Sequence, residues 1–172
     1  MTRDHIPYSI VVMGVSGSGK STIGRQLALA LDGVFLDGDD YHPAANIEKM
    51  SSGIPLTDSD RMPWLDILHA QLEQYRHQKI ACVLACSALK QSYRDLLSGG
   101  GNDVTFLYLK GSFDEISMRI CARNGHFMPP ALLQSQFDDL EEPNDSITIH
   151  ISHSPASIIR QTIDMLYARS HE

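Results

Sequence analysis

Residues 14–21 read Gly-Val-Ser-Gly-Ser-Gly-Lys-Ser and match the pattern G-x-x-x-x-G-K-[ST] in full. The apolar residues 8–13 before this stretch predict a buried strand, and residues 22–31 after it carry apolar side chains at helical spacing. A glycine-rich turn between a strand and a helix lets backbone N–H groups surround a polyphosphate at the helix N-terminus. The chain is therefore expected to bind a nucleoside triphosphate.

Two side chains of this loop have expected chemical roles. Lys20 is placed to reach the β- and γ-phosphates, which makes it a catalytic candidate, and the Ser21 hydroxyl is placed to bind Mg²⁺. The candidate nucleotide contacts in and beside the loop are Gly14, Ser16, Gly17, Ser18, Gly19, Lys20, Ser21 and Thr22.

Strand-like and helix-like segments alternate along the rest of the chain. Further strands are predicted at 33–37, 80–86, 104–109 and 147–151, and helices at 63–77, 88–97, 113–123, 131–140 and 155–169. This alternation predicts an α/β fold, with three α/β/α layers around a parallel sheet. The length of 172 residues suits a single domain, 1–172. In such folds ligands bind at the carboxyl ends of the strands.

Charge and cysteine content narrow the partners and the compartment. A formal charge of −7 makes nucleic acids and anionic membranes poor partners. No apolar run approaches the ~20 residues of a membrane span, and residues 1–7 lack the apolar core of a signal peptide. Cys82, Cys86 and Cys121 lack metal-ligand spacing and are interpreted as buried structural thiols. These features predict a cytoplasmic protein.

Two carboxylates flank Gly38 at the end of the second predicted strand. If the chain is still extended there, Asp37 and Asp39 point to the same side, roughly 6–7 Å apart. Phosphoryl transfer to an alcohol needs one group on the Mg²⁺ side and another that accepts the hydroxyl proton. Asp39 is therefore the candidate base and Asp37 the candidate ligand of Mg²⁺ or its waters. Turn residues that bond their own backbone are the alternative interpretation.

Basic residues cluster after strand ends or on the helices that lead from them: Lys20, Arg61, Lys90, Arg94, Arg119 and Arg123. Arg119 and Arg123 are four residues apart and would share a helix face. They precede a Gly/Pro-containing segment that could close over the nucleotide. Because guanidinium groups bind phosphate in a bidentate manner, the pair is a candidate γ-phosphate clamp, with Arg119 a catalytic candidate. A solvated helix face is the alternative.

Two histidines are candidates for hydrogen bonds to a polyol. His42 follows the acidic cluster, and His126 lies in the Gly/Pro-containing segment. Neither has the neighbours of a zinc site, and a locally bonded or surface histidine is the alternative for each.

Beyond the phosphate loop, the chain resembles the gluconate kinase family. The matching blocks are residues 36–43, 46–50, 53–56, 58, 60–61, 63–65, 86–90, 93–95, 126–129, 132–133, 135–137 and 142–143. The resemblance spans about residues 10–151. It implies ATP-dependent phosphorylation of D-gluconate at its 6-hydroxyl, and a five-stranded parallel sheet similar to that of nucleoside monophosphate kinases. It also implies a mobile lid at about 123–137 and a homodimer.

The resemblance further implies a substrate site. A segment at about 40–63 would cover the sugar acid. The implied substrate contacts are Asp39, His42, Arg61, Ser87, Lys90, Arg94 and His126. Among them, the cations Arg61, Lys90 and Arg94 are candidates for the carboxylate, and Ser87 and His42 for the hydroxyls.

The chain departs from common patterns at two places. Asp145 is followed by Ser146, where the family often has an Asp-Glu pair. The third predicted strand ends in Cys86-Ser87 without the acidic residue of many P-loop ATPases, which leaves Asp37 as the metal-side carboxylate.

Two other functions are alternatives to gluconate phosphorylation. A kinase for another small acid, such as shikimate or a different hexonate, fits the acidic pair and the arginine cluster, but residues 58–65 and 126–129 favour gluconate. A nucleotide-dependent switch would carry the guanine-specifying string Asn-Lys-x-Asp, which is absent, and it gives the acceptor-site residues no role.

Overall fold

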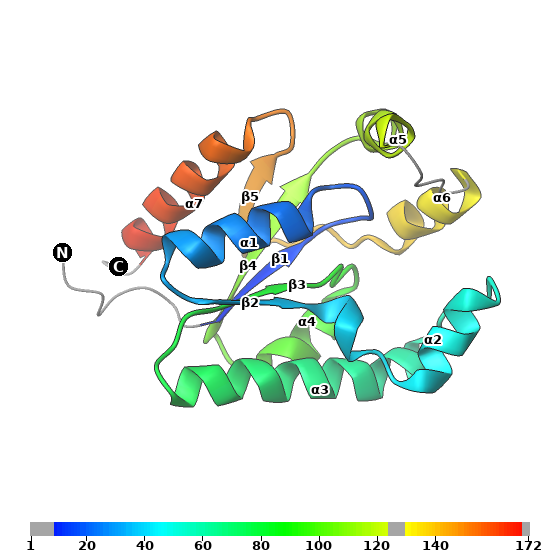
Figure 1. Ribbon diagram of the computed structural model, residues 1–172, viewed down its shortest axis with the longest axis horizontal. Helices are drawn as coiled ribbons and strands as arrows, with labels where there is room; N and C mark the ends of the chain where they lie inside the picture. The colour runs from blue at the N-terminus through cyan, green and yellow to red at the C-terminus, as the bar shows by residue number, and fades with distance from the viewer. Residues whose placement is uncertain (1–8, 124–129, 170–172) are drawn as a thin grey trace.

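One five-stranded parallel sheet organises the protein. The computed structural model describes residues 9–123 and 130–169 (Figure 1). The strands are β1 Ser9–Met13, β2 Val34–Asp37, β3 Cys82–Ala85, β4 Val104–Lys110 and β5 Ile147–His150. Their order across the sheet is β2-β3-β1-β4-β5, and every neighbouring pair is parallel. The predicted α/β class and the parallel sheet are confirmed.

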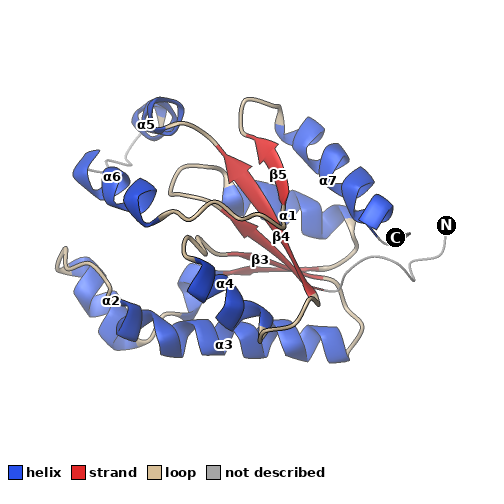
Figure 2. Cartoon of the chain, turned by 180° about the vertical axis from the view of Figure 1, so that it is seen from behind, coloured by secondary structure: helices blue, strands red, loops and turns tan. Residues whose placement is uncertain are grey.

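Helices cover both faces of this sheet. They are α1 Lys20–Ala30, α2 Ala44–Ser51, α3 Asp58–His77, α4 Gln91–Ser98, α5 Phe113–Ala122, α6 Pro130–Asp139 and α7 Pro155–Arg169, with a 3₁₀ turn at Gly38–Tyr41. Helices α1 and α7 lie over one face, and α3 and α4 over the other (Figures 1 and 2). This arrangement confirms the three layers. No helix in the described part of the chain is long and apolar enough to cross a membrane.

The hydrophobic core has two halves because side chains alternate along each strand. On β1, Ile10 and Val12 pack with α1, α5 and α7, whereas Val11 and Met13 pack with α3 and α4. All four side chains are fully buried. A strand covered on both faces must be apolar throughout, which explains why this segment lacks polar alternation.

The region between β2 and α3, where no helix or strand was predicted, is ordered into helical elements. It contains the 3₁₀ turn and α2, and α3 begins at Asp58 rather than near Pro63. A capping box starts α3: the Thr57 side chain accepts the N–H of Asp60, and the Asp60 carboxylate accepts the N–H of Thr57. Pro63 therefore lies inside the helix.

The cysteines are only partly as predicted. Cys82 and Cys86 are buried, and burial raises the pKa of both thiols to about 12, so they stay protonated as structural residues. Cys121 is exposed, contrary to the prediction. It lies near the end of α5, on the side of the helix that does not face the core.

Candidate active site

The phosphate loop connects β1 to α1 and depends on glycine for its shape. Gly14, Gly17 and Gly19 have φ angles of 146°, 82° and 98°, which side-chain-bearing residues rarely adopt. A Cβ on Gly17 would also lie 2.7 Å from Cγ1 of Ile120 on α5. The loop therefore lies directly against α5.

Lys20 points back across this loop. Its Nζ donates to the carbonyl oxygen of Val15 at 3.0 Å. Burial lowers the pKa of the Lys20 ammonium; the negative charges of Asp39 and Asp37 oppose this shift, and Arg123 adds to it. The predicted lysine, both carboxylates and one of the two arginines are thus gathered at the carboxyl edge of the sheet.

Asp37 connects the phosphate loop to the turn that follows β2. Its Oδ2 accepts the Ser21 hydroxyl at 3.1 Å, and its Oδ1 accepts the backbone N–H of Asp39 at 3.1 Å. The chain therefore leaves the extended conformation after Asp37, so the condition on which the same-side arrangement of Asp37 and Asp39 was predicted is not met. Asp37 caps the 3₁₀ turn, as in the alternative interpretation, and still lies beside Ser21. Asp39 is exposed.

Trp64, which the sequence analysis did not assign to the site, supports this turn. Its indole Nε1 donates to the carbonyl oxygen of Gly38 at 2.7 Å, and its side chain is buried. The His42 ring stacks on the Trp64 ring, with centroids 4.1 Å apart and planes inclined by 17°. Trp64 therefore fixes both the turn that carries Asp39 and the orientation of His42. One sequence feature could have indicated this role: Trp64 is the single tryptophan of the chain and lies within a block that matches the family.

The charges of both the candidate base Asp39 and the candidate acid-binding cation Arg61 act on His42. Its Nδ1 is 3.3 Å from Nδ2 of Asn46. Partial burial lowers the pKa of the imidazole; the charge of Asp39 opposes this shift, and that of Arg61 adds to it. The neutral ring is thus favoured and can both donate and accept a hydrogen bond.

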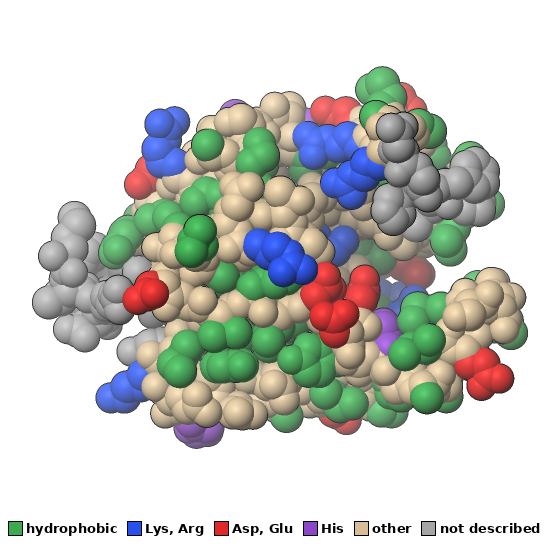
Figure 3. Space-filling view, in the orientation of Figure 1, with side chains coloured by type: hydrophobic (Ala, Val, Ile, Leu, Met, Phe, Trp, Pro, Cys, Tyr) green, Lys and Arg blue, Asp and Glu red, His purple; other side chains and the backbone are tan. Residues whose placement is uncertain are grey.

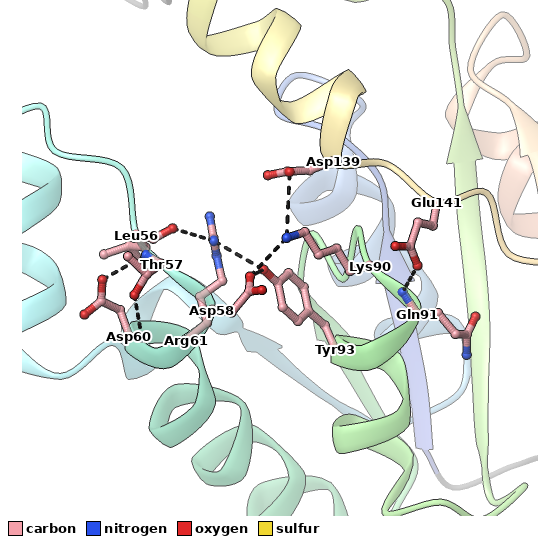
Figure 4. Close-up of polar contacts among 10 residues, drawn as sticks. All are labelled: Leu56, Thr57, Asp58, Asp60, Arg61, Lys90, Gln91, Tyr93, Asp139 and Glu141. Atoms are coloured by element: carbon pink, nitrogen blue, oxygen red, sulfur yellow. Dashed lines mark hydrogen bonds and ion pairs between the residues drawn. The ribbon is translucent and has the colours of Figure 1, made fainter.

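Arg61 and Lys90 meet around the Tyr93 ring (Figure 4). The Arg61 guanidinium carbon and Lys90 Nζ lie 5.6 and 5.7 Å from the ring centroid. Nη1 of Arg61 donates to the carbonyl oxygen of Leu56 at 2.6 Å and to the Tyr93 hydroxyl at 3.3 Å. Lys90 Nζ is 3.1 Å from Oδ1 of Asp58 and 3.9 Å from an oxygen of Asp139 on α6. Two of the three predicted acid-binding cations are therefore neighbours.

Arg94, the third, is placed differently. It is only 2% exposed. Its Nη1 donates to the carbonyl oxygens of Ala88 and Leu89 at 2.8 and 3.0 Å, and its Nη2 donates to Oε1 of Gln91 and the carbonyl oxygen of Glu141 at 2.9 and 2.8 Å. This burial argues against the predicted contact with a substrate carboxylate. Arg94 instead ties the start of α4 to the segment before β5.

Ser87 lies at the carboxyl end of β3, next to the phosphate loop. Its carbonyl oxygen accepts the N–H of Gly14 at 3.3 Å. The side chain is half-buried, and its contact with a substrate hydroxyl stays a prediction.

Arg119 and Arg123 were predicted to share a helix face, but they do not. Helix α5 ends at Ala122, and Arg123 is extended, with φ −82° and ψ 111°. Arg123 is exposed, and its charge reaches Lys20. Arg119 is half-buried, and its Nη2 donates to the carbonyl oxygen of Ile151. The structure thus brings Arg123 toward the phosphate loop and holds Arg119 at the end of β5.

Gln136 on α6 is a site residue that the motifs did not indicate. Its Oε1 accepts the backbone N–H of Ser16 at 2.7 Å, and its Nε2 donates to the Ser16 hydroxyl at 3.0 Å. Helix α6, part of the predicted lid, is therefore attached to the phosphate loop. His126 and the other residues from 124 to 129 of the predicted lid lie outside the described residues.

These parts surround one opening of the molecule. In Figure 3, acidic and basic side chains gather at the hollow between the part that carries α2 and the part that carries α6. Among residues 9–123 and 130–169, no group of three His, Cys, Asp or Glu side chains is placed to hold a metal ion. A cation here would therefore depend on Ser21, Asp37 and phosphate oxygens.

Replacement of Gln136 by Ala should loosen α6. Two hydrogen bonds to Ser16, each worth ~0.5–1.5 kcal/mol, would be lost, so amide hydrogen exchange in residues 130–139 should accelerate by roughly tenfold. Gln134→Ala is the matched control because the Gln134 amide donates to Asp138 of the same helix, and no hydrogen bond links it to the phosphate loop within the described residues. Equal exchange rates in the two variants would show that Gln136 does not hold the helix.

Known proteins are similar to this chain in sequence and in fold. The family model for shikimate kinase matches residues 16–166. The thermosensitive gluconokinase of Escherichia coli K12 is 48% identical over 158 residues, which cover 89% of this chain and 84% of that protein. The thermoresistant gluconokinase of the same organism is 44% identical over 170 residues, with coverages of 96% and 97%. A crystal structure of a gluconokinase from Sinorhizobium meliloti 1021 superposes with a TM-score of 0.87 at 42% identity, covering 97% of this chain and 95% of that one. The chain therefore belongs to the gluconokinase family of shikimate kinase-like P-loop kinases.

Proposed function

We propose that this protein is a gluconokinase, which transfers the γ-phosphoryl group of ATP to the 6-hydroxyl of D-gluconate. One observation carries the proposal: a complete phosphate loop, an exposed carboxylate at Asp39 and the cationic pair Arg61 and Lys90 lie around the same end of the sheet. An enzyme that phosphorylates a sugar acid needs these three parts. The gluconokinase relatives, at identities above 40%, favour gluconate over shikimate as the acid.

The phosphate loop and its neighbours would hold ATP. The loop N–H groups and Lys20 would surround the phosphates, and Arg123 is the arginine whose charge already reaches that region. Arg119 donates from Nη2 to the carbonyl oxygen of Ile151, which holds its guanidinium at the end of β5. We therefore propose Arg123 as the main arginine contact and Arg119 as one that requires a side-chain rearrangement.

The oxygens of Ser21 and Asp37 would hold Mg²⁺. Their separation of 3.1 Å brings together a hydroxyl and a carboxylate, the hard donors that Mg²⁺ prefers. Such sites supply few protein ligands and leave the remaining positions to phosphates and water. When bound, the ion would neutralise charge on the phosphates.

Asp39 would act as the base. As the 6-hydroxyl oxygen bonds to the γ-phosphorus, Asp39 takes the hydroxyl proton and the bond to the β-phosphate oxygen breaks, which leaves ADP and 6-phosphogluconate. The position of Asp39 is held by the Asp37 carboxylate on its own N–H and by Trp64 on the preceding residue, Gly38. A base on a fixed turn keeps a constant distance to its substrate.

The other end of gluconate would lie against the cations around Tyr93. Arg61 and Lys90 are the candidates for the carboxylate, and His42, on which the charges of Asp39 and Arg61 both act, is the candidate for a hydroxyl. Ser87 is a second candidate for a hydroxyl. The carboxylate and the 6-hydroxyl are at opposite ends of the substrate, so separate groups of the site would bind them.

Proposals for the cellular compartment and the oligomeric state rest on the sequence and the family resemblance. We propose a cytoplasmic location, consistent with three free cysteines, and a homodimer.

Purified protein with Mg²⁺ and ATP should release ADP only when D-gluconate is added. ADP release is measured with D-gluconate, idonate, shikimate and glucose in turn, and a coupled reaction with 6-phosphogluconate dehydrogenase identifies the product formed from gluconate. Turnover with shikimate but not with gluconate would reject the proposed function.

Replacement of Asp39 by Asn should lower kcat by roughly 10²-fold or more, because the amide cannot accept the hydroxyl proton. ATP affinity, measured by calorimetry, should stay near the wild-type value. Asp40→Asn is the control, since Asp40 is an equally exposed neighbour in the same turn. A wild-type kcat in Asp39→Asn would move the base to another residue.

A further inference from the structure

One of the cations proposed to bind gluconate, Lys90, already contacts a carboxylate, that of Asp58, and Arg61 is linked to the same carboxylate through Tyr93 (Figure 4). Lys90 Nζ lies 3.1 Å from Oδ1 of Asp58, and the Tyr93 hydroxyl donates to the same oxygen. The Tyr93 hydroxyl in turn accepts from Nη1 of Arg61 at 3.3 Å. One oxygen of Asp58 is therefore the point toward which this cluster is directed.

The cluster also favours the charged form of Asp58. The hydrogen bond from Tyr93 and then that from Lys90 lower the pKa of this carboxyl, and the charges of Lys90 and Arg61 add to the shift. Asp58 thus offers the cluster the same chemical group that a sugar acid offers: an ionised carboxylate.

Helix α3 does not need this carboxylate in order to begin. Asp58 is the first residue of α3, but the capping box that closes the helix N-terminus consists of Thr57 and Asp60. Asp60 has its own cation, because Lys49 Nζ lies 2.8 Å from its Oδ2. The Asp58 carboxylate is therefore available for a role other than capping.

The contact is also open to exchange. The Asp58 side chain is 64% exposed, compared with 27% for Lys90. Exposed ion pairs are weak because water screens them, so a second carboxylate can take the place of Asp58. Asp139 on α6 also faces Lys90, but at 3.9 Å it does not form a hydrogen bond.

We propose that Asp58 determines specificity by competing with the substrate carboxylate for Lys90, Tyr93 and Arg61. This inference rests on the proposed function. An acidic substrate can displace Asp58, because its own carboxylate replaces the negative charge that Asp58 had placed next to the cations. A neutral polyol offers no such exchange and leaves Asp58 in place. The site thus selects for a carboxylate through an internal competitor as well as through its cations.

The substitution Asp58→Asn tests this competition. It keeps the shape of the side chain and removes the charge, so KM for gluconate should fall about fivefold, the factor that corresponds to about 1 kcal/mol, and kcat should change little. D-Glucitol, which has a similar hydroxyl chain but no carboxylate, serves as a competitive inhibitor. Its inhibition constant should stay near the wild-type value.

Two further variants serve as controls. Asp66→Asn removes the same charge from an exposed position of the same helix and should leave KM unchanged. Asp58→Glu restores the carboxylate and should bring KM back toward the wild-type value.

Other results would reject either this inference or the proposed function. A raised or unchanged KM in Asp58→Asn would overturn the inference, because a residue that only positions Lys90 and Tyr93 would weaken gluconate binding when removed. An equal fall in KM for gluconate and in the glucitol inhibition constant would also overturn it, since the effect would then not depend on the carboxylate. Wild-type protein without gluconate-dependent turnover would instead reject the proposed function itself.

Discussion

The pairing of β1 with β3 continues beyond the ends of both strands, and the site depends on this extension. The N–H of Cys86 donates to the carbonyl oxygen of Val12 at 3.1 Å, and the N–H of Gly14 donates to the carbonyl oxygen of Ser87 at 3.3 Å. These two bonds join the start of the phosphate loop to the segment that leads to Lys90. The nucleotide end and the acid end of the site are thereby held by one backbone ladder between two inner strands of the sheet.

Helix α3 sets the relation between the base and the acid-binding cations. Arg61 and Trp64 are three residues apart and so lie on one side of the helix. Trp64 supports the turn of Asp39 through the carbonyl oxygen of Gly38, whereas Arg61 contacts Tyr93. A single rigid element therefore spans the proposed acceptor site, which suits a substrate of fixed length between its carboxylate and its reacting hydroxyl.

The sequence predicted those features that local patterns encode. The phosphate loop, the strands and the parallel sheet follow from motif and periodicity, and the family resemblance indicated Arg61 and Lys90. Contacts between distant residues could not be read from one chain: Gln136 and Ser16 are 120 positions apart, and Arg119 meets a carbonyl oxygen 32 positions away. Arg94 was predicted to bind the substrate because its burial depends on how α4 packs, which the sequence does not reveal. Pro63 suggested a helix start, but the capping box at Thr57 begins the helix earlier.

We propose that gluconate lies with its reacting hydroxyl at Asp39 and its carboxylate at Arg61 and Lys90. A crystal structure with D-gluconate and a non-hydrolysable ATP analogue would show this orientation. The 6-hydroxyl oxygen is expected at about 2.6–3.2 Å from an Asp39 oxygen, in line with the γ-phosphate. The substrate carboxylate is expected in contact with Arg61 and Lys90. A gluconate bound in the reverse direction, with its carboxylate next to Asp39, would rule out the proposed orientation.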